Sequence, residues 1–352
     1  MTNLTLPPIA APLLAWYDAN KRALPWRRDH DPYRVWVSEI MLQQTRVAAV
    51  IPYYERWMQA LPDVTALASV DDEQLMKLWQ GLGYYSRARN LKKAAQVIAN
   101  EHGGQFPRTY DALLKLPGVG EYTAGAIASI AFGGRVGAVD GNVLRIAARL
   151  CDFHEDILDP RVKKAMRAAV DAAVPQERSG DFNQALMDLG ATVCLPNGKP
   201  LCKDCPLAAL CRARENGTAL SLPARAKKAK RRIEEMTVFL LIKDGAVALR
   251  KRGDDGLLAG LWEFPHVPGT LDENAAAETL KSFGLTATDW KKKITAKHIF
   301  THIEWHMTGY LASVQGSGLS DFVWAERETL AALAVPGAFK KYYTECEKAL
   351  SD

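Results

Sequence analysis

Residues 116–149 read LPGVGEYTAGAIASIAFGGRVGAVDGNVLRIAAR, and this stretch decides the fold of the chain. Its first turn, Leu116-Pro117-Gly118-Val119-Gly120, lies between two segments whose apolar residues recur at helical spacing. Gly118 and Gly120 can reach backbone conformations that a side chain disfavours, and they let another surface come close. The N–H groups of such a turn and of the next helix start have no partner inside the helix, and they bind phosphate well. The stretch therefore predicts a helix, a tight glycine turn and a second helix.

An aspartate follows about twenty residues later, in the segment Val139-Asp140-Gly141-Asn142 before a helical pattern over 143–150. Asp140 stands where an N-cap belongs, and its side chain would accept hydrogen bonds from free N–H groups. It can also be a carboxylate that the positive helix end keeps ionised beside a reacting centre. The two interpretations are compatible, because a cap is also a rigid mount.

This glycine hairpin followed by an aspartate resembles the helix-hairpin-helix DNA glycosylases of base excision repair. The resemblance implies an all-α N-terminal glycosylase region that binds double-stranded DNA. It also implies that Gly118, Val119 and Gly120 hold the DNA, that Asp140 is catalytic, and that Asn142 supports Asp140.

Composition limits the remaining classes of protein. The chain has 352 residues, 48% of them hydrophobic, which is enough for two domains with cores of their own. Its net charge of +5 permits nucleic-acid binding without requiring it. It has no run of eighteen apolar residues, and its N-terminus lacks the basic start of a signal peptide. We therefore expect no membrane contact, a cytoplasmic protein (at the nucleoid if the source is bacterial) and a monomer.

Four of the six cysteines lie close together in the pattern C-x7-C-x2-C-x5-C. Without a secretory signal, a disulfide framework is disfavoured. Four thiolates at this spacing suit Zn²⁺ or an iron–sulfur cluster, and the spacing does not choose between them. The resembled superfamily carries a 4Fe-4S cluster here, with one residue fewer in the first gap. The resemblance therefore implies a 4Fe-4S cluster bound by Cys194, Cys202, Cys205 and Cys211.

The motif WVSEIMLQQT at 36–45 follows a strong helix start at Pro32, and we expect its helix to continue toward Pro52. A glutamate on a helix usually faces solvent. Apolar neighbours would instead raise the pKa of Glu39 and make it a proton donor near neutral pH. The motif resembles that of adenine-specific mismatch glycosylases, which remove adenine paired with 8-oxoguanine. This implies Glu39 as the general acid and Gln43 and Gln44 at the opened base pair; the alternative for both glutamines is ordinary helix surface.

Residues 62–100 carry two more helical patterns, joined by the turn WQGLGYYSRARN at 79–90. Paired glycines, paired tyrosines and two arginines suit a turn that wedges an aromatic ring into a duplex. One tyrosine of the pair can equally belong to the core, and the resemblance implies that Tyr84 is the wedge. It also places the helix ending in FNQALMDLGATVC toward the adenine pocket. Gln184 on that helix and Arg27 are candidates to hold the adenine.

Position 122 distinguishes two reactions. Members of the superfamily that also cut the DNA strand carry a lysine two residues after the hairpin, and its amine forms a Schiff base with the sugar. Here the hairpin is followed by Glu121-Tyr122, so no Schiff base can form at this position. We expect base removal by water alone, with the Tyr122 hydroxyl bonded to Asp140 or to the reacting sugar.

The character of the chain changes after the cysteines. Residues 223–232 read PARAKKAKRR, which is basic, lacks periodic apolar positions and is typical of a linker. The linker is either a solvated tether or a segment near the DNA backbone. We divide the chain into a helical catalytic region at 1–222, a basic linker at 223–235 and a second domain at 236–352.

The second domain has strand, Asp-Gly turn and helix patterns that predict an α/β fold and resemble Nudix domains. The Nudix box needs clustered carboxylates for Mg²⁺. After Gly260 the chain has Glu263 and Glu278 but no R-E-x2-E-E run, so nucleotide hydrolysis is not expected. The resemblance implies that this domain recognises 8-oxoguanine through Phe300, Thr301 and His302, by intercalation and polar contact.

These features together predict a monofunctional adenine glycosylase acting on DNA with A:8-oxoguanine or A:G mispairs. In the predicted reaction, the adenine flips out, Glu39 protonates its N7, Asp140 stabilises or traps the sugar cation, and water completes hydrolysis. Two alternatives remain, an endonuclease III-like glycosylase-lyase and a non-catalytic DNA-damage binding protein. Tyr122 and the Nudix-like domain count against the first, and the presence of both acids counts against the second.

Overall fold

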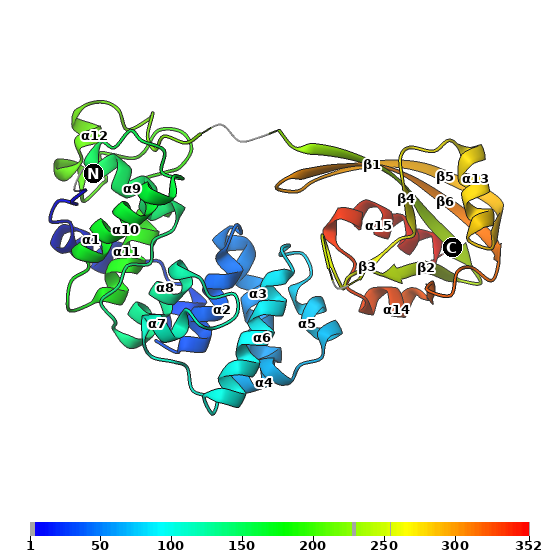
Figure 1. Ribbon diagram of the computed structural model, residues 1–352, viewed down its shortest axis with the longest axis horizontal. Coiled ribbons are helices and arrows are strands. Elements are labelled where there is room, and N and C mark those ends of the chain that lie inside the picture. The colour runs from blue at the N-terminus through cyan, green and yellow to red at the C-terminus, as the bar shows by residue number, and fades with distance from the viewer. Residues whose placement is uncertain (1–3, 227–229, 254, 352) are drawn as a thin grey trace. The chain divides into compact units, whose positions relative to one another are not determined.

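The computed structural model describes residues 4–226, 230–253 and 255–351. Its contacts divide the chain into two compact units. The helical unit comprises residues 1–70 and 89–227, and the mixed unit comprises residues 71–88 and 228–352 (Figure 1). Each unit has a hydrophobic core of its own.

The helical unit is built around α8 (Glu121–Phe132), whose residues 123–130 are all buried. A helix that is apolar all round belongs inside a protein rather than on its surface. α2 (Pro32–Leu42) and α11 (Ser179–Thr192) pack against α8, and α9 (Gly141–Cys151) packs against α11. Further helices of this unit are α1 (Ala10–Asn20), η1 (Pro25–Arg27), α3 (Val47–Ala60), α4 (Val64–Ser69), α7 (Tyr110–Leu113), α10 (Pro160–Ala173), η2 (Ala208–Leu210), α12 (Arg212–Glu215) and most of α6 (Ser86–Glu101).

Two glycines of the stretch at 116–149 allow close approaches that position the site. Gly118, in the turn between α7 and α8, has a φ of +72°, and a Cβ there would lie 2.5 Å from the Cβ of Asn90. A Cβ on Gly125 in α8 would lie 2.4 Å from the carbonyl oxygen of Gly137, three residues before Asp140. A side chain at either position would force its neighbours to move. The predicted helix, glycine turn and helix are present.

The helix that carries Glu39 is shorter than expected. α2 ends at Leu42, and Gln43 is its C-cap. Gln44 has a φ of 58°, a left-handed conformation that cannot continue a right-handed helix. The expectation of one helix running toward Pro52 is therefore wrong, because Pro52 lies inside the next helix, α3.

Residues 62–100 contain three helices rather than the two expected. Asp63 accepts a hydrogen bond from the N–H of Ala66 and begins α4. Asp71 accepts one from the N–H of Gln74 and begins α5 (Asp72–Trp79), and α6 follows a glycine-containing turn. Each aspartate satisfies a free N–H group, so the chain starts a new helix twice within this region.

The mixed unit contains a seven-stranded sheet with the order β3-β2-β1-β6-β5, in which β4 also pairs with β1 and β7 with β2. β1 runs parallel to β6 and antiparallel to β2. The predicted turn between β1 and β2 has positive φ at both Asp244 and Gly245, as two-residue hairpins require. The strands are β1 (Arg232–Lys243), β2 (Ala246–Lys251), β3 (Trp262–Glu263), β4 (His266–Pro268), β5 (Leu285–Ile299), β6 (Ile303–Gly316) and β7 (Val323–Ala325).

β1 is buried on both faces, which explains its unbroken apolar run. Val238 and Leu240 belong to a core that includes residues of α14 (Arg327–Ala332) and α15 (Lys340–Ala349). Phe239 and Leu241 belong to another core, which includes residues of α13 (Glu273–Ser282). Alternate residues of a strand point to opposite faces, so helices cover both sides of this sheet (Figure 1). A further short helix, η3 (Gly337–Phe339), precedes α15.

The region expected to be a linker differs from the structure at its end. β1 begins at Arg232, whose N–H donates to the carbonyl of His302 at 3.0 Å, so residues 232–235 are strand. Residues 227–229 of the expected linker lie outside the described residues. Within the described ranges, no helix is both long enough and apolar enough to cross a membrane.

Candidate active site

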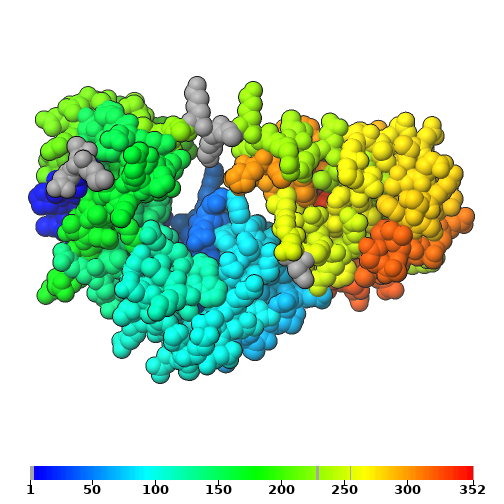
Figure 2. Space-filling model, viewed as in Figure 1, coloured from blue at the N-terminus to red at the C-terminus, as the bar shows by residue number. Residues whose placement is uncertain are grey.

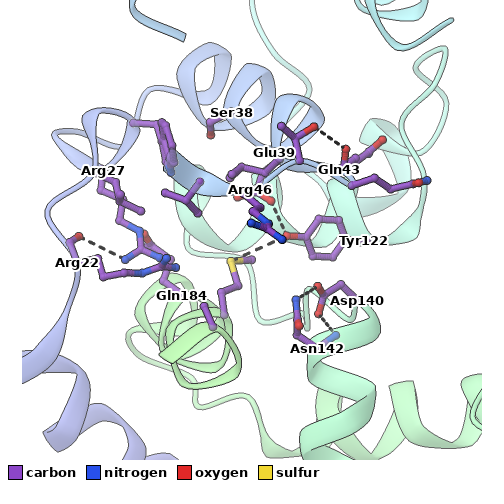
Figure 3. A pocket seen from close by; sticks show the side chains of 18 of the residues that line it. Arg22, Arg27, Ser38, Glu39, Gln43, Arg46, Tyr122, Asp140, Asn142 and Gln184 are labelled. Atoms are coloured by element: carbon purple, nitrogen blue, oxygen red, sulfur yellow. Dashed lines mark hydrogen bonds between the residues drawn. The ribbon is translucent and has the colours of Figure 1, made fainter. Parts of the chain in front are cut away.

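A cavity of about 930 Å³ lies in the helical unit. The space-filling view shows this unit hollowed between its blue N-terminal helices and its green helices (Figure 2). The close-up shows side chains from α2, α8, α9 and α11 directed toward one space (Figure 3). Of the residues predicted from the sequence, those that line this cavity are Arg27, Glu39, Gln43, Gln44, Tyr122, Asp140, Asn142 and Gln184.

Glu39 is buried in the middle of α2, where only 5% of its surface is exposed. Trp36 and Ile40, its apolar neighbours on the helix, are buried with it. Burial raises the pKa of Glu39 to about 7, although the Tyr122 hydroxyl and the Arg27 guanidinium act in the opposite direction. Glu39 therefore does not face solvent, and it can donate a proton near neutral pH.

Asp140 is the N-cap of α9, as predicted. Its Oδ1 accepts hydrogen bonds from the N–H groups of Asn142 at 2.8 Å and Val143 at 2.9 Å. Its Oδ2 accepts one from Nδ2 of Asn142 at 2.7 Å. Arg145 in turn donates to Oδ1 of Asn142 at 3.0 Å and so fixes this amide. Three donors at a helix N-terminus are suitable surroundings for an anion.

Tyr122 contacts a different acid from the one expected. Its hydroxyl donates to Oε2 of Glu39 at 2.5 Å and lies 4.0 Å from Sδ of Met187. Of the two expected partners, Asp140 and the reacting sugar, the first is not the one bonded here, because Tyr122 lies on the first turn of α8 and α8 packs against α2, the helix of Glu39. Tyr122 therefore orients the carboxyl group that carries the proton.

Arg27 is held in place by a residue that the sequence did not single out. Arg27 donates to both carboxylate oxygens of Asp188, at 2.7 and 2.9 Å, and Nε of Arg22 donates to the same carboxylate at 2.7 Å. Asp188 is completely buried and lies one turn after Gln184 on α11. The only signal for Asp188 in the sequence was one acidic residue in the apolar run FNQALMDLG.

Gln43 and Gln44 line the cavity from the turn after α2, so they are not ordinary helix surface. Gly118 and Val119 lie elsewhere, in the turn before α8, and are not among the lining residues. Gly120, the N-cap of α8, makes no side-chain hydrogen bond. The cap therefore leaves the first N–H groups of α8 without a side-chain acceptor, which suits a phosphate.

The four clustered cysteines line a second, small cavity next to Arg149. Arg149 donates to Sγ of Cys194 at 3.2 Å, and Arg145 donates to its carbonyl at 2.8 Å. Within the described residues, no group of three or more His, Cys, Asp or Glu side chains is placed to hold a single metal ion. The cysteines of this cavity are Cys194, Cys202, Cys205 and Cys211, each partly buried and outside any disulfide.

The predicted recognition residues form the turn between β5 and β6. Phe300 is partly buried and packs edge-on against Trp305 and His298, with ring centroids 4.8 and 4.5 Å apart. Thr301 and His302 are exposed. The expectation that Phe300 intercalates is therefore not favoured, because its ring is packed onto the core of the mixed unit and anchors the turn.

Tyr84 and Tyr85 have different surroundings, in accord with one core tyrosine and one exposed one. Tyr84 is 47% exposed and has a φ of 48°, whereas Tyr85 is buried. Within the mixed unit, the Tyr84 hydroxyl lies 2.8 Å from Oγ1 of Thr301. The two residues predicted to meet DNA in different roles are therefore neighbours.

Glu263 and Glu278, which follow the position of a Nudix box, have other partners. Glu263 is 3% exposed; it accepts a hydrogen bond from Nε of Arg250 at 3.0 Å and forms an ion pair with Arg252. Glu278 pairs with Lys281 on the surface of α13. Two guanidinium groups thus pair with Glu263, the buried carboxylate of these two.

The chain is similar to known proteins over most of its length. Residues 37–172 match the family described as HhH-GPD superfamily base excision DNA repair protein, and residues 237–345 match the NUDIX domain family. The chain is 38% identical to the adenine DNA glycosylase of Homo sapiens, over 94% of this chain and 72% of that protein. It is 40% identical to the adenine DNA glycosylase of Arabidopsis thaliana, over 87% of this chain and 57% of that protein.

Two solved structures are each similar to 59% of the chain. A thermostable thymine-DNA glycosylase matches with a TM-score of 0.53 and 30% identity, over 59% of this chain and 95% of that one. A non-covalent endonuclease III–DNA complex matches with a TM-score of 0.50 and 27% identity, over 59% of this chain and 96% of that one.

The raised pKa of Glu39 predicts how stability depends on pH. Its folded value of about 7 exceeds the ordinary 4.5, so its contribution to the free energy of unfolding is full below about pH 4.5 and is lost as the pH rises through 7. Glu39→Gln is neutral at every pH and avoids this loss. Relative to the parent, the variant should gain about 2–3 kcal/mol between pH 5 and pH 8, measured by denaturant unfolding.

The matched control is Glu121→Gln, which removes an exposed carboxylate from the start of α8. It should show no comparable gain. An equal effect of Glu39→Gln at pH 5 and pH 8 would show that the Glu39 carboxyl is not protonated by burial.

Proposed function

This chain belongs to the family of adenine DNA glycosylases, and we propose that it hydrolyses the N-glycosidic bond of adenine paired with 8-oxoguanine or guanine in double-stranded DNA. One observation carries the proposal: Glu39 and Asp140 line the same cavity in opposite surroundings. Glu39 is dehydrated and keeps a proton near neutral pH, whereas Asp140 accepts three hydrogen bonds at a helix N-terminus. A base stacked in a duplex cannot reach either group, so the adenine must be flipped into the cavity.

Glu39 acts as the general acid on the flipped adenine. Its proton goes to N7, and the electron pair of the breaking glycosidic bond is taken up by the protonated ring. The Tyr122 hydroxyl holds the Glu39 carboxyl through Oε2 and so limits its orientation. Arg27 and Gln184 line the wall of the cavity, where they can bond the edges of the base.

Asp140 acts on the sugar, where positive charge develops as the bond breaks. It stabilises the oxocarbenium ion or forms a bond to C1′ that water later displaces. The Asn142 amide and the N–H groups of α9 keep this carboxylate in one orientation. Water adds its hydroxide to C1′, and its proton returns to Glu39. Tyr122 offers no amine for a Schiff base, so the DNA strand stays intact.

We assign a 4Fe-4S cluster to the cavity lined by four thiols, because four cysteine thiolates are the ligand set of such a cluster. A bound cluster would hold iron through four thiolates and can exchange single electrons. The steps of base removal above use side chains alone. Arg145 donates both to the Asn142 amide and to the carbonyl of Cys194, so the cluster loop also supports the mount of Asp140.

The turn between β5 and β6 reads the base opposite the adenine in this proposal. Thr301 and His302 present an exposed hydroxyl and imidazole, which suit the altered edge of 8-oxoguanine. Phe300 anchors the turn by packing on Trp305. We infer that Tyr84, which is exposed and lies beside Thr301, enters the duplex. We also infer that the turn at 118–120 binds a DNA phosphate.

The reaction is tested with a duplex that carries one adenine opposite 8-oxoguanine. The parent protein should make the strand cleavable only after alkali treatment, because base removal leaves an intact abasic site. Glu39→Gln should bind the duplex normally but release adenine about 10²–10⁴-fold more slowly, since an amide cannot donate this proton.

Glu121→Gln is again the control and should release adenine at the parent rate. Near-normal release by Glu39→Gln would refute the assignment of the acid. Cleavage by the parent without alkali would indicate an endonuclease III-like lyase, and no cleavage would indicate a DNA-damage binding protein.

The cluster is tested by metal analysis and substitution. The purified protein should be brown and contain about four irons per chain, the number in a cubane held by four cysteines. Cys202→Ser should lose iron, whereas Cys151→Ser, which removes a cysteine outside the four that line the cavity, should keep it. A colourless, fully active protein that contains zinc would contradict the assignment.

The reading of the opposite base is tested by single-turnover release of adenine from A:8-oxoguanine and A:G duplexes. Thr301→Ala with His302→Ala should reduce the ratio of the two rates, because each lost base contact costs about 1–3 kcal/mol of discrimination. Thr295→Ala, exposed on β5 away from the turn, should leave the ratio unchanged. An unchanged ratio in the double variant would exclude this turn from lesion recognition.

A further inference from the structure

A buried ion pair lies at the wall of the cavity. Asp188 is completely buried and accepts hydrogen bonds from the N–H and Nε of Arg22, at 3.2 and 2.7 Å. It also accepts two from Arg27, at 2.7 and 2.9 Å. The Arg22 side chain is 26% exposed, but that of Arg27 is only 12% exposed. Arg22 can turn toward water if its partner is lost, so Arg27 depends more strongly on Asp188.

Arg27 lines the same cavity as Glu39 and influences its proton. Burial has the largest effect on the pKa of Glu39 and raises it; the hydrogen bond from Tyr122 and the charge of Arg27 lower it, and Asp140 raises it. Arg27 itself faces Asp188 on α11, Tyr17 on α1 and Glu39 on α2. A bare guanidinium beside a dehydrated carboxyl group strongly favours the carboxylate.

We propose that Asp188 is a positioning residue that neutralises Arg27, so that this cation can bond the adenine without converting Glu39 into an anion. The guanidinium is paired with a carboxylate through two hydrogen bonds, so the pair has little net charge. Arg27 still offers N–H donors to the cavity. Asp188 thus helps to keep Glu39 protonated, although it contacts neither Glu39 nor, in this proposal, the substrate. The inference rests on Glu39 being the acid of the proposed function.

An electrostatic role is distinguishable from a merely structural one by its dependence on pH. If Asp188 only held Arg27 in place, its loss would slow base removal by the same factor at every pH. If Asp188 shields Glu39, its loss moves the alkaline limb of the rate, where Glu39 loses its proton, to lower pH. Base removal at low pH, where Glu39 is protonated in either protein, is then nearly unaffected.

The experiment measures single-turnover adenine release from pH 5 to pH 9 for the parent and three variants. Asp188→Asn leaves Arg27 unpaired and should move the alkaline limb down by about one pH unit, which lowers the rate about tenfold at pH 8 and less than about twofold at pH 5.5. Arg27→Met removes the cation and leaves the carboxylate, so the alkaline limb of its rate profile should move to higher pH. Arg27→Met with Asp188→Leu should return the limb close to its position in the parent.

Asp181→Asn is the matched control, because Asp181 lies two turns earlier on α11 and pairs with Arg178 at 2.9 Å. Its limb should not move. A uniform loss of rate in Asp188→Asn, or limbs that move the same way in Asp188→Asn and Arg27→Met, would overturn the proposal. If Asp188→Asn does not fold, the upward limb of Arg27→Met and its reversal in the double variant decide the question.

The parent profile separates this proposal from the function on which it rests. A parent without an alkaline limb would show that Glu39 is not the acid, and the proposed reaction would fail first. A parent with that limb, and variants whose limbs do not move, would leave the reaction standing and refute the coupling through Asp188.

Discussion

The removal of water from the Glu39 carboxyl group is the constraint on which the rest of the site depends. A carboxyl group in water is ionised at neutral pH, and an ionised group cannot protonate a purine. Burial between α2 and α8 raises the pKa of Glu39 to about 7. The same burial strengthens the effect of nearby cations, which act through a medium of low dielectric constant and favour the ionised carboxylate over the protonated acid. Tyr122, which donates a hydrogen bond but carries no charge, is therefore a suitable direct partner for this acid.

Much of the fold could be predicted because local rules and global packing agree. The stretch at 116–149 contains its own helix starts, glycine turns and apolar faces, and α8 and α9 lie where these patterns place them. The unbroken apolar run of β1 likewise reflects burial on both faces. The boundary errors lie where one element ends and the next begins, after α2, between α4 and α5, and at the start of β1. Gln44 adopts a left-handed conformation that its residue type does not predict, so the sequence pattern does not reveal the end of α2.

The site could be predicted where a residue's role is local and not where it depends on packing. Asp140 caps its own helix, and its place before Gly141 reveals this in the sequence. The sequence offers Asp140 or the reacting sugar as the partner of Tyr122, whereas its partner Glu39 is set by how α8 packs on α2, which no local pattern encodes. Asp188 was missed for the same reason, since its partners Arg22 and Arg27 lie more than 150 positions away along the chain. Phe300 belongs to the turn expected to intercalate, and its packing on Trp305 appears only in the folded sheet.

The two acids need contradictory surroundings within one cavity, and the architecture of the helical unit reconciles them. Glu39 lies in the middle of a helix, where the backbone N–H groups are already bonded and only apolar neighbours remain. Asp140 lies at the beginning of a helix, where free N–H groups are available to a carboxylate. α8 packs directly on α2, and its Gly125 admits the backbone of the segment that leads to Asp140. The glycine-rich stretch thus brings a helix middle and a helix start to one space, so that a single cavity presents a dehydrated carboxyl group and one that accepts three hydrogen bonds.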